Sequence, residues 1–545
     1  MRSKRMCGVG LGVALVLSAA GCAAPEPGPP QNLSAPVARP PADGLTMLGD
    51  ADPAAGAVDA SAALFEASPV VVLAGSGFEL SAASVAVALG VPALPADADP
   101  DVLSTELDRL GADHVVLLGE GPAETVLEGR TALHVEPTGP ALEAALGVRF
   151  TERTVAADAS AAEAVSGLDP ASPELLVAES GSPASPTDAP VSEPLPELEP
   201  AERASGLVAL AVDDSAGIAG LATARAAGAE VLILPADRPN PQASPEAIEF
   251  LAQHADARVV ALGPELGAEP SLDWKIASAR SGLQLPGGGQ LLFPAHMMVA
   301  IYGTPGAPVL GVLGEQDLPA SIERARRHAA AFDELTDKTV LPAFELIATV
   351  ASSSAGSDKN YSNELDPAGM LEWAEAAGEA GMYAILDLQP GHTDFVSQAK
   401  LYEESLRLPW VGLALDPEWR LGPGEKHMVH IGSVGSAEVN AVQDYLTELV
   451  RAHDLPPKLL VLHQFRNDMI EDRAGIETDR PEVTVLIHAD GQGSQPEKQA
   501  TWQRLRTDAP DVAWGWKNFY DEDAPMLDPE QTMMVEPVPD LITYQ

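Results

Sequence analysis

Cysteine, aromatic residues and basic residues are all scarce in this chain of 545 residues. Its two cysteines are Cys7 and Cys22, so the sequence after Cys22 offers no thiol for a disulfide bond or a nucleophile. Only 4% of residues are aromatic, and 32 lysines and arginines stand against 80 acidic residues. The formal charge of −48 opposes binding to nucleic acid and to anionic lipid head groups. We therefore expect no nucleic-acid partner.

The apolar stretch near the N-terminus, residues 8–20, is too short to cross a bilayer comfortably. It follows a basic segment and ends in the small residues Ser18-Ala-Ala-Gly21 before Cys22, which predicts a signal peptide over residues 1–21. This ending resembles the cleavage box of bacterial lipoproteins. The resemblance implies that Cys22 is lipidated, becomes the new N-terminus and anchors the protein on the outer face of the cell membrane. A secreted protein with an incidental cysteine is the alternative.

Shifts in composition divide the rest of the chain. Residues 22–66 are rich in Pro, Ala, Gly and Asp, and we predict a disordered tether there because such a segment buries little apolar surface. Residues 151–200 are rich in Ala, Ser, Pro and Glu, which predicts a linker. The remaining segments predict three folded parts: an α/β unit at 67–150, a second α/β unit at 201–290 and a larger domain at 291–545.

The two α/β units share one order of elements. In residues 70–119, a strand with a glycine turn, a helix of small residues, a second strand, an amphipathic helix and a third strand follow one another, and this βαβαβ order returns at 207–263. The pattern resembles the type 2 cell-wall-binding repeat of Gram-positive surface proteins, which implies binding to a wall polymer. Generic α/β units without a ligand are the alternative. The turn Gly75-Ser-Gly77 lacks the third glycine of a dinucleotide fingerprint, so we expect no nucleotide.

Alternating apolar runs and helical stretches continue to the C-terminus. Eight strands within about 250 residues predict a TIM-type (β/α)8 barrel, so the fold class is α/β throughout. An open doubly wound sheet is the alternative. The predicted strands are 297–302, 343–350, 383–388, 411–415, 459–462, 483–487, 512–516 and 541–544.

Carboxyl groups follow several of these strands. The run 411–415 ends in Asp416-Pro-Glu418, and Asp387 and Asp490 lie at the ends of two other strands. Because the carboxyl ends of barrel strands face one cleft, these acids are expected to meet there. Paired carboxyls suit the cleavage of a glycosidic bond, with Glu418 as the acid. Asp416, Asp387 and Asp490 compete for the second role.

The Asp-x-Glu triplet at a strand end resembles the glycoside hydrolase barrels, including the lysozyme-like ones that cut peptidoglycan. That resemblance implies cell-wall polysaccharide or another envelope glycan as the substrate; a non-catalytic glycan-binding lipoprotein is the alternative. We predict no cofactor and no metal, although His463, His488, Asp490 and Asp387 could hold one. The predicted substrate-binding residues are Trp419, His463, Gln464, His488, Trp516 and Lys517.

Overall fold

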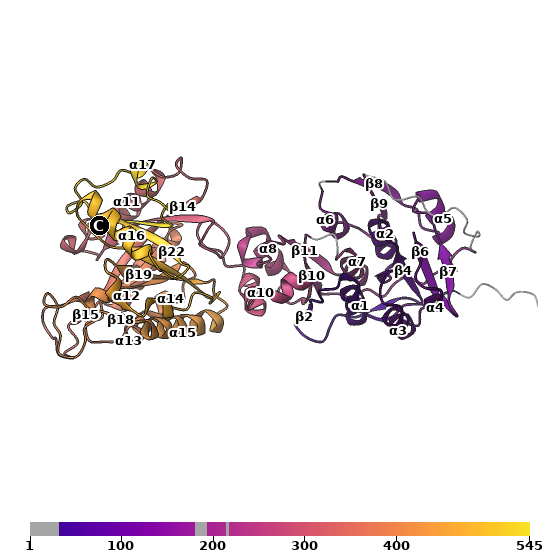
Figure 1. Ribbon diagram of the computed structural model, residues 1–545, viewed down its shortest axis with the longest axis horizontal. Coiled ribbons are helices and arrows are strands. Elements are labelled where there is room, and N and C mark those ends of the chain that lie inside the picture. The colour runs from indigo at the N-terminus through magenta and orange to yellow at the C-terminus, as the bar shows by residue number, and fades with distance from the viewer. Residues whose placement is uncertain (1–31, 158, 180–192, 214–216) are drawn as a thin grey trace, which may run out of the picture.

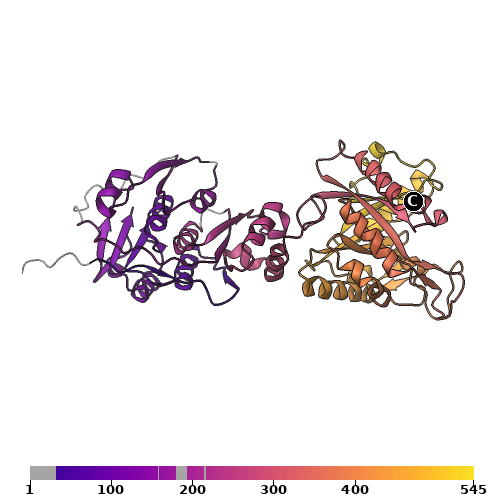
Figure 2. The same cartoon turned by 180° about the vertical axis from the view of Figure 1, so that it is seen from behind.

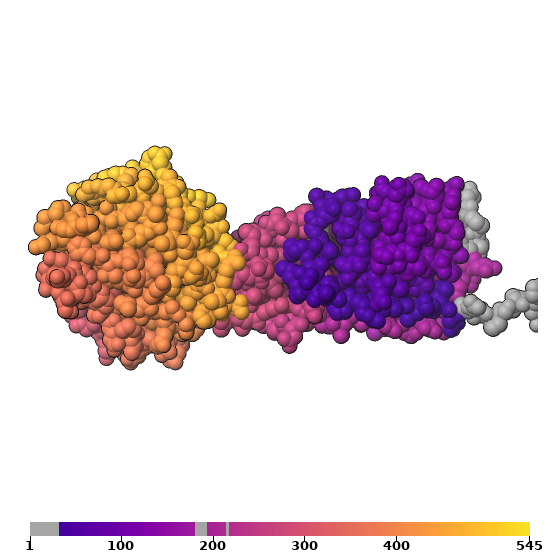
Figure 3. Space-filling view, turned by 90° about the horizontal axis from the view of Figure 1, so that it is seen from below, coloured from indigo at the N-terminus to yellow at the C-terminus, as the bar shows by residue number. Residues whose placement is uncertain are grey.

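The computed structural model describes residues 32–157, 159–179, 193–213 and 217–545. The predicted signal peptide and Cys22 lie outside these ranges. Within them, no helix is long and apolar enough to cross a membrane. Figure 1 shows two lobes along the longest axis, an N-terminal α/β lobe and a C-terminal barrel, and Figure 3 shows the narrow waist between them.

Two four-stranded parallel sheets form the N-terminal lobe. Their strand orders are β5-β4-β6-β7 and β11-β10-β12-β2. In both sheets the first strand of the predicted repeat lies between the second and the third, so the two units share one topology. The strands are β4 (Val70–Ala74), β5 (Ala93–Pro95), β6 (His114–Leu118), β7 (Thr131–His134), β10 (Leu207–Val212), β11 (Glu230–Leu234), β12 (Arg258–Leu262) and β2 (Leu45–Leu48).

Residues 37–66, which composition assigns to a disordered tether, are folded instead. Strand β2 pairs in parallel with β12 and takes the place in the second sheet that β7 takes in the first. Helix α1 (Pro53–Leu64) starts at Asp52, whose carboxylate accepts a hydrogen bond from the Ala54 amide. The composition argument was wrong here because the alanines of α1 bury themselves against a helix that lies more than 150 residues further along the chain.

That helix is α7 (Ile218–Ala227), which packs against α1 and against α2 (Glu79–Leu89). The three helices present mainly alanine and other small side chains, so their backbones approach closely. A single hydrophobic cluster runs from the first sheet through these helices to one face of the second sheet. The two predicted units are therefore halves of one lobe.

Part of the predicted linker 151–200 also belongs to this lobe. Strands β8 (Thr151–Val155) and β9 (Glu174–Ala178) pair in parallel, and α6 (Ala161–Ser166) connects them. The hydroxyl of Ser81 in α2 donates to the carbonyl of Leu176 in β9 at 3.0 Å. Residues 180–192 lie outside the described ranges.

Helix α10 (Leu272–Arg280) joins the lobes. The Ser278 hydroxyl donates to the carbonyl of Leu455 at 3.0 Å, and the Arg451 guanidinium donates to the Ser271 hydroxyl at 2.7 Å. Helix α8 (Pro245–Gln253) packs on α10 and completes the N-terminal side of the waist, as the reverse view in Figure 2 shows.

The C-terminal domain is a closed barrel of eight parallel strands, which confirms the predicted fold class. The strand order is β13-β23-β22-β21-β19-β17-β16-β14, and β13 pairs with β14 to close the ring. The eight strands are β13 (His296–Gly303), β14 (Thr339–Ala351), β16 (Tyr383–Leu388), β17 (Val411–Leu415), β19 (Lys458–Gln464), β21 (Val483–Ala489), β22 (Ala513–Asn518) and β23 (Leu541–Tyr544). Around them lie α11 (Leu318–Ala330), α12 (Pro367–Glu379), α13 (Phe395–Ala399), α14 (Glu403–Leu406), α15 (Ser436–Ala452) and α16 (Gln495–Arg506).

Alternation along each strand separates two cores. In β14, for example, Leu341 and Ala343 belong to the cluster inside the barrel, whereas Phe344 and Leu346 belong to the cluster beneath the helices. Leu285 and Leu292, which precede β13, also belong to the interior cluster. The barrel is thus a packed core, and only its carboxyl end is free for chemistry.

Candidate functional site

Each barrel strand carries a polar side chain at an inward-facing position toward its carboxyl end, and only in β14 (Thr339–Ala351) does the strand continue well past it. Seven of these groups carry or can gain a charge, and all belong to buried residues, so each must be held by its neighbours. They are Tyr302, Glu345, Asp387, Asp416, His463, His488, Lys517 and Thr543, from β13, β14, β16, the end of β17, β19, β21, β22 and β23. Together they close the barrel interior with a polar ring.

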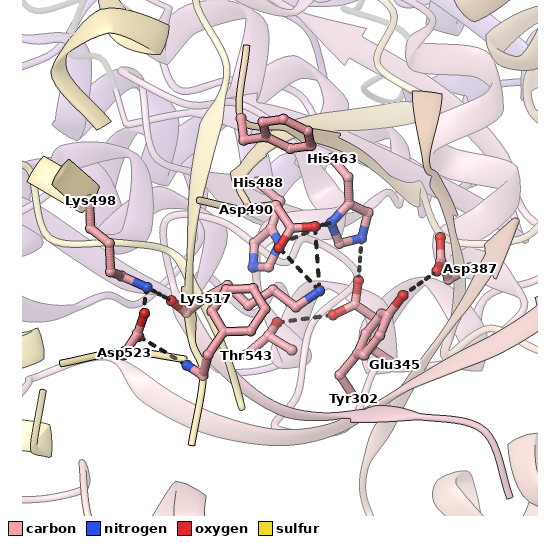
Figure 4. A network of polar contacts seen from close by, with 12 residues as sticks. Tyr302, Glu345, Asp387, His463, His488, Asp490, Lys498, Lys517, Asp523 and Thr543 are labelled. Carbon is pink, nitrogen blue, oxygen red and sulfur yellow. Dashed lines mark hydrogen bonds and ion pairs between the residues drawn. The ribbon is translucent and has the colours of Figure 1, made fainter. Parts of the chain in front are cut away.

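His463 is the centre of this ring (Figure 4). Its Nε2 lies 2.7 Å from Oε1 of Glu345, and its Nδ1 lies 3.3 Å from Oδ2 of Asp490. Burial opposes protonation of the ring, but the charge of Glu345 and the hydrogen bonds to both acids raise the pKa of His463 well above its ordinary value. We assign His463 as an imidazolium that bridges two carboxylates.

The pKa values of the two acids beside His463, Glu345 and Asp490, are lowered. Burial alone would raise the pKa of Glu345, but the charge and hydrogen bond of His463 lower it to about 2. For Asp490, burial is likewise outweighed by the charge of Lys517 and by His463, so its pKa lies below the ordinary value. Both groups are therefore carboxylates at neutral pH.

Lys517 provides the second positive charge. Its Nζ lies 3.3 Å from Oδ1 of Asp490 and 3.7 Å from the centre of the Tyr302 ring, which is a cation–π contact. Although burial opposes the charged form, the surrounding carboxylates raise the pKa of Lys517. Two cations, His463 and Lys517, thus balance two carboxylates, Glu345 and Asp490.

Three further carboxyl groups form no ion pair with any of the described residues. Burial, followed by the neighbouring acids, raises the pKa of Asp416 well above its ordinary value. Burial also raises the pKa of Asp387 to about 6, even though the Tyr302 hydroxyl donates to its Oδ2 at 2.8 Å. For Glu418, burial and then the charge of Asp490 raise the pKa to about 7. The site therefore holds ionised and protonated carboxyl groups side by side.

A cleft of about 540 Å³ opens above this ring. Asp416, Glu418 and Asp490 line it together with Lys517 and Tyr302. Its walls also include the aromatic side chains of Trp419, Phe465 and Phe519. The cleft thus brings together Asp416 and Glu418 from the end of β17 and Asp490 from the end of β21.

Buried interactions also hold the rim of the cleft. Lys498 in α16 donates to Oδ2 of Asp523 at 2.7 Å and to the carbonyl of Lys517 at 2.6 Å. The other oxygen of Asp523 accepts from the Gly493 amide, while Oδ2 also accepts from the Phe519 amide. The loops after β21 and β22 are therefore fixed to each other (Figure 4).

A metal ion has one candidate set of ligands among the described residues. Ligand atoms of Glu345, His463 and His488 lie within 4.8 Å of one another. Metal binding requires neutral imidazoles, and the two acids that flank His463 favour its protonated form instead. His488 differs, because burial lowers its pKa to about 3 and its Nε2 has no hydrogen-bond partner among the described residues. The set fits an ion pair with a neutral neighbour better than it fits a metal.

The structure separates two predicted residues from the site. Gln464 follows His463 on β19 and so faces outward, where its amide contacts Arg466 and Arg473. Trp516 precedes Lys517 on β22 and faces the helices, where it packs edge-on against Trp502 at 5.6 Å. Both side chains are buried in the outer layer, so neither can bind a substrate in the cleft.

The other predicted residues converge. Asp416, Glu418, Trp419, Asp490 and Lys517 line the cleft. The remaining three, Asp387, His463 and His488, are fully buried members of the same ring.

Sequence analysis missed Tyr302, Glu345 and Thr543. Glu345 sits inside a long apolar strand, and Thr543 donates to its Oε2 at 3.0 Å. The signal that could have identified Glu345 is an acid at the inward parity of a buried strand, two positions after Ala343. An unneutralised carboxylate would not be tolerated there.

Comparisons with known proteins add little. No family model matches the chain, and no curated protein matches its sequence. A solved structure, that of Cwp6 from Clostridium difficile, matches with 11% identity and a TM-score of 0.31. The match covers 64% of this chain and 63% of Cwp6, which is less than two thirds of that protein.

Proposed function

We propose that the barrel is a glycoside hydrolase that acts on a polysaccharide of the bacterial cell envelope. The observation that carries this proposal is a pair of carboxyl groups in one cleft whose pKa values move apart. Glu418 has a pKa raised to about 7, and Asp490 has a pKa below its ordinary range. Such a pair supplies an acid and a base or nucleophile at the same pH.

Glu418 is the proposed general acid. It follows Pro417 in a short 3-10 turn (Pro417–Trp419) just past the end of β17, so its carboxyl group faces the cleft. A carboxyl group with a pKa near 7 keeps its proton near neutral pH and can transfer it to the leaving glycosidic oxygen.

Asp490 is the proposed second carboxyl group. Lys517 and His463 hold it as an anion, in position to stabilise an oxocarbenium-like transition state or to activate water. The raised pKa values of Asp416 and Asp387 disfavour these two acids for that role. In this scheme Glu345 is a positioning residue, because it holds His463 against Asp490 and need not touch the substrate.

The cleft walls support a sugar as the ligand. Trp419 packs edge-on against His427 with ring centroids 5.2 Å apart, which fixes the indole at the rim. Flat aromatic rings match the apolar faces of sugars. The acidic chain and the carboxyl-rich cleft disfavour a strongly anionic substrate.

The cellular location in this proposal rests on the N-terminal sequence. The signal-peptide pattern before Cys22 supports export, and its resemblance to the lipoprotein cleavage box supports a lipid anchor on the outer face of the membrane. Mass spectrometry of the N-terminal peptide from the native host should find Cys22 as the first residue, carrying acyl chains. A secreted chain with an unmodified Cys22 would contradict the anchor.

The catalytic proposal is tested by the release of labelled sugar from Gram-positive cell walls. Glu418→Gln should lower the rate by at least about 100-fold, because the amide cannot donate the acidic proton. Glu404→Gln, which alters an exposed residue of α14, is the matched control and should retain the wild-type rate. Equal release by wild type and Glu418→Gln would eliminate Glu418 as the acid.

The second candidate is a glycan-binding protein without catalysis. It is favoured by the number of fully paired charges in the ring, which a structural role also explains. Wild-type protein that sediments with purified walls but releases no sugar would support binding and overturn hydrolysis.

A further inference from the structure

The second sheet of the N-terminal lobe has a crevice of its own. Strands β10, β12 and β2 end at a hollow of about 260 Å³, where β10 lies between strands reached by crossovers in opposite directions. In open parallel sheets, such switch points at the carboxyl edge are where ligands bind. The first turns of α1 and α7 border the hollow, and its apolar surface includes Leu48, Leu221 and Leu262.

The repeat provides an internal comparison, because the first sheet has the same switch point and fills it. Gly119 follows β6, and an added Cβ there would lie 2.3 Å from Cδ2 of Phe78. Phe78 immediately precedes α2 and is 4% exposed, so its ring occupies the space between the strand ends.

The second sheet has a glycine, Gly217, at the position where the first sheet has Phe78. Gly217 immediately precedes α7, as Phe78 precedes α2. Gly263 follows β12, as Gly119 follows β6. Among the described residues, an added Cβ on Gly263 would meet the Glu265 carboxylate at 3.1 Å and Val212 at 3.9 Å. The crevice is thus open because the plugging side chain is absent from the described helix start.

Charge in the lining restricts the ligand. Asp50 and Glu265 contribute carboxyl groups, and none of the described lining residues is basic, which disfavours an anion. The partial positive charges at the two helix N-termini offset part of this negative charge and weaken the attraction for a cation. The buried Oε2 of Glu265 has no hydrogen-bond partner among the described residues, so it can accept a hydroxyl from a ligand.

We propose that this crevice is a second binding site, separate from the barrel, that takes one neutral hydroxylated ring such as a single sugar unit. Apolar side chains face one side of the ring, the carboxylates of Glu265 and Asp50 accept hydrogen bonds from its hydroxyl groups, and backbone amides at the start of α7 donate to its oxygens. The volume lies just below the range of drug-sized sites, which suits a ligand of that size.

The test is binding of free sugars to the full-length chain by saturation-transfer NMR titration. D-glucose, D-galactose and N-acetyl-D-glucosamine are the probes, with inorganic phosphate and ethanolamine as the anionic and cationic alternatives. We expect at least one sugar to bind and both ionic probes to fail. Binding of an ionic probe alone, or of no probe, would overturn the proposal.

Gly217→Phe assigns the binding to this crevice, because it restores the plug that the first sheet carries. Gly217 has φ −84° and an added Cβ would meet no atom of the described residues within 4 Å, so the variant should fold. We expect at least tenfold weaker sugar binding. Gly369→Phe, at a similarly open glycine in α12, is the matched control and should bind as wild type does. Unchanged binding by Gly217→Phe would show that the sugar sits elsewhere and overturn the proposal.

Discussion

The barrel mouth and the crevice of the second sheet both lie at the carboxyl ends of parallel strands, yet they use opposite chemistry. Closure of the barrel brings eight strand ends around one axis, so each inward position meets several others. Buried charges there can neutralise one another, as His463 does with Glu345 and Asp490. The open sheet brings only a few strand ends together, and mostly small and apolar residues line its crevice, with Asp50 and Glu265 as the acids. Topology therefore decides how much buried charge a strand edge can hold.

The largest expected difference between the barrel mouth and the crevice is in the loss of folding stability when an acid is removed. Glu345→Ala leaves His463 in a fully buried position without its closest carboxylate, so we expect a loss of about 3–5 kcal/mol. Calorimetry should show the barrel transition lowered by about 6–20 °C. Glu265→Ala, at the crevice, should change stability by less than about 0.5 kcal/mol, because none of the described basic side chains forms an ion pair with it.

Equal shifts of the unfolding temperature in Glu345→Ala and Glu265→Ala would contradict the claim that the barrel mouth and the crevice differ in buried charge. Glu345→Gln separates charge from shape, since the amide can still accept from Thr543 or contact His463. It should cost less than Glu345→Ala. A cost for the amide as large as that for alanine would show that ionic pairing dominates at this position, and a cost near zero would show that packing does.

A second prediction concerns the two glycines that end β6 and β12. Gly119 and Gly263 have φ of +88° and +102°, so alanine is strained at both. Gly119→Ala must also displace the buried Phe78 ring, whereas Gly263→Ala meets only the flexible end of Glu265. Gly119→Ala should therefore cost about 1–3 kcal/mol more, measured by urea unfolding of the N-terminal lobe. Equal costs would show that the first crevice is not plugged as described.

Sequence alone predicted the barrel because its signals are local and repeated. The eight strands match within a few residues, and an acid next to a strand end such as Asp416 or Asp490 predicts its own place at the mouth. Glu345 was missed because its importance depends on His463, 118 residues away. The prediction of a disordered tether at residues 22–66 was wrong over 37–66 for a similar reason. Helix α1 is stable only against α7, and composition does not reveal a packing partner so distant in the chain.

The alternation of side chains along a strand explains why Trp516 and Gln464, which were predicted to bind substrate, face away from the cleft. Gly515 and Lys517 face the barrel interior, and an added Cβ on Gly515 would lie 2.1 Å from Cδ2 of His488. Trp516 must then face the helices. The same alternation turns Gln464 outward beside His463. The sequence places Trp516 and Gln464 near strand ends, but the prediction did not assign which face of the strand each side chain takes.

The last prediction is the pH dependence of stability at Glu418. It tests whether the barrel mouth, unlike the crevice of the second sheet, holds a carboxyl group with a strongly raised pKa. Its pKa is raised from 4.5 to about 7 on folding, so its protonated form favours the folded state. That contribution is complete below about pH 4.5 and is lost as the pH rises through 7. Glu418→Gln does not titrate, so it should be more stable than wild type at pH 8, by about 1–2 kcal/mol, and nearly equal to it at pH 4. Urea unfolding at both pH values measures this. A variant less stable than wild type at pH 8 would mean that the Glu418 carboxylate is stabilised by its surroundings, and a group stabilised in that way would be too weakly basic to hold the proton that the proposed acid must donate.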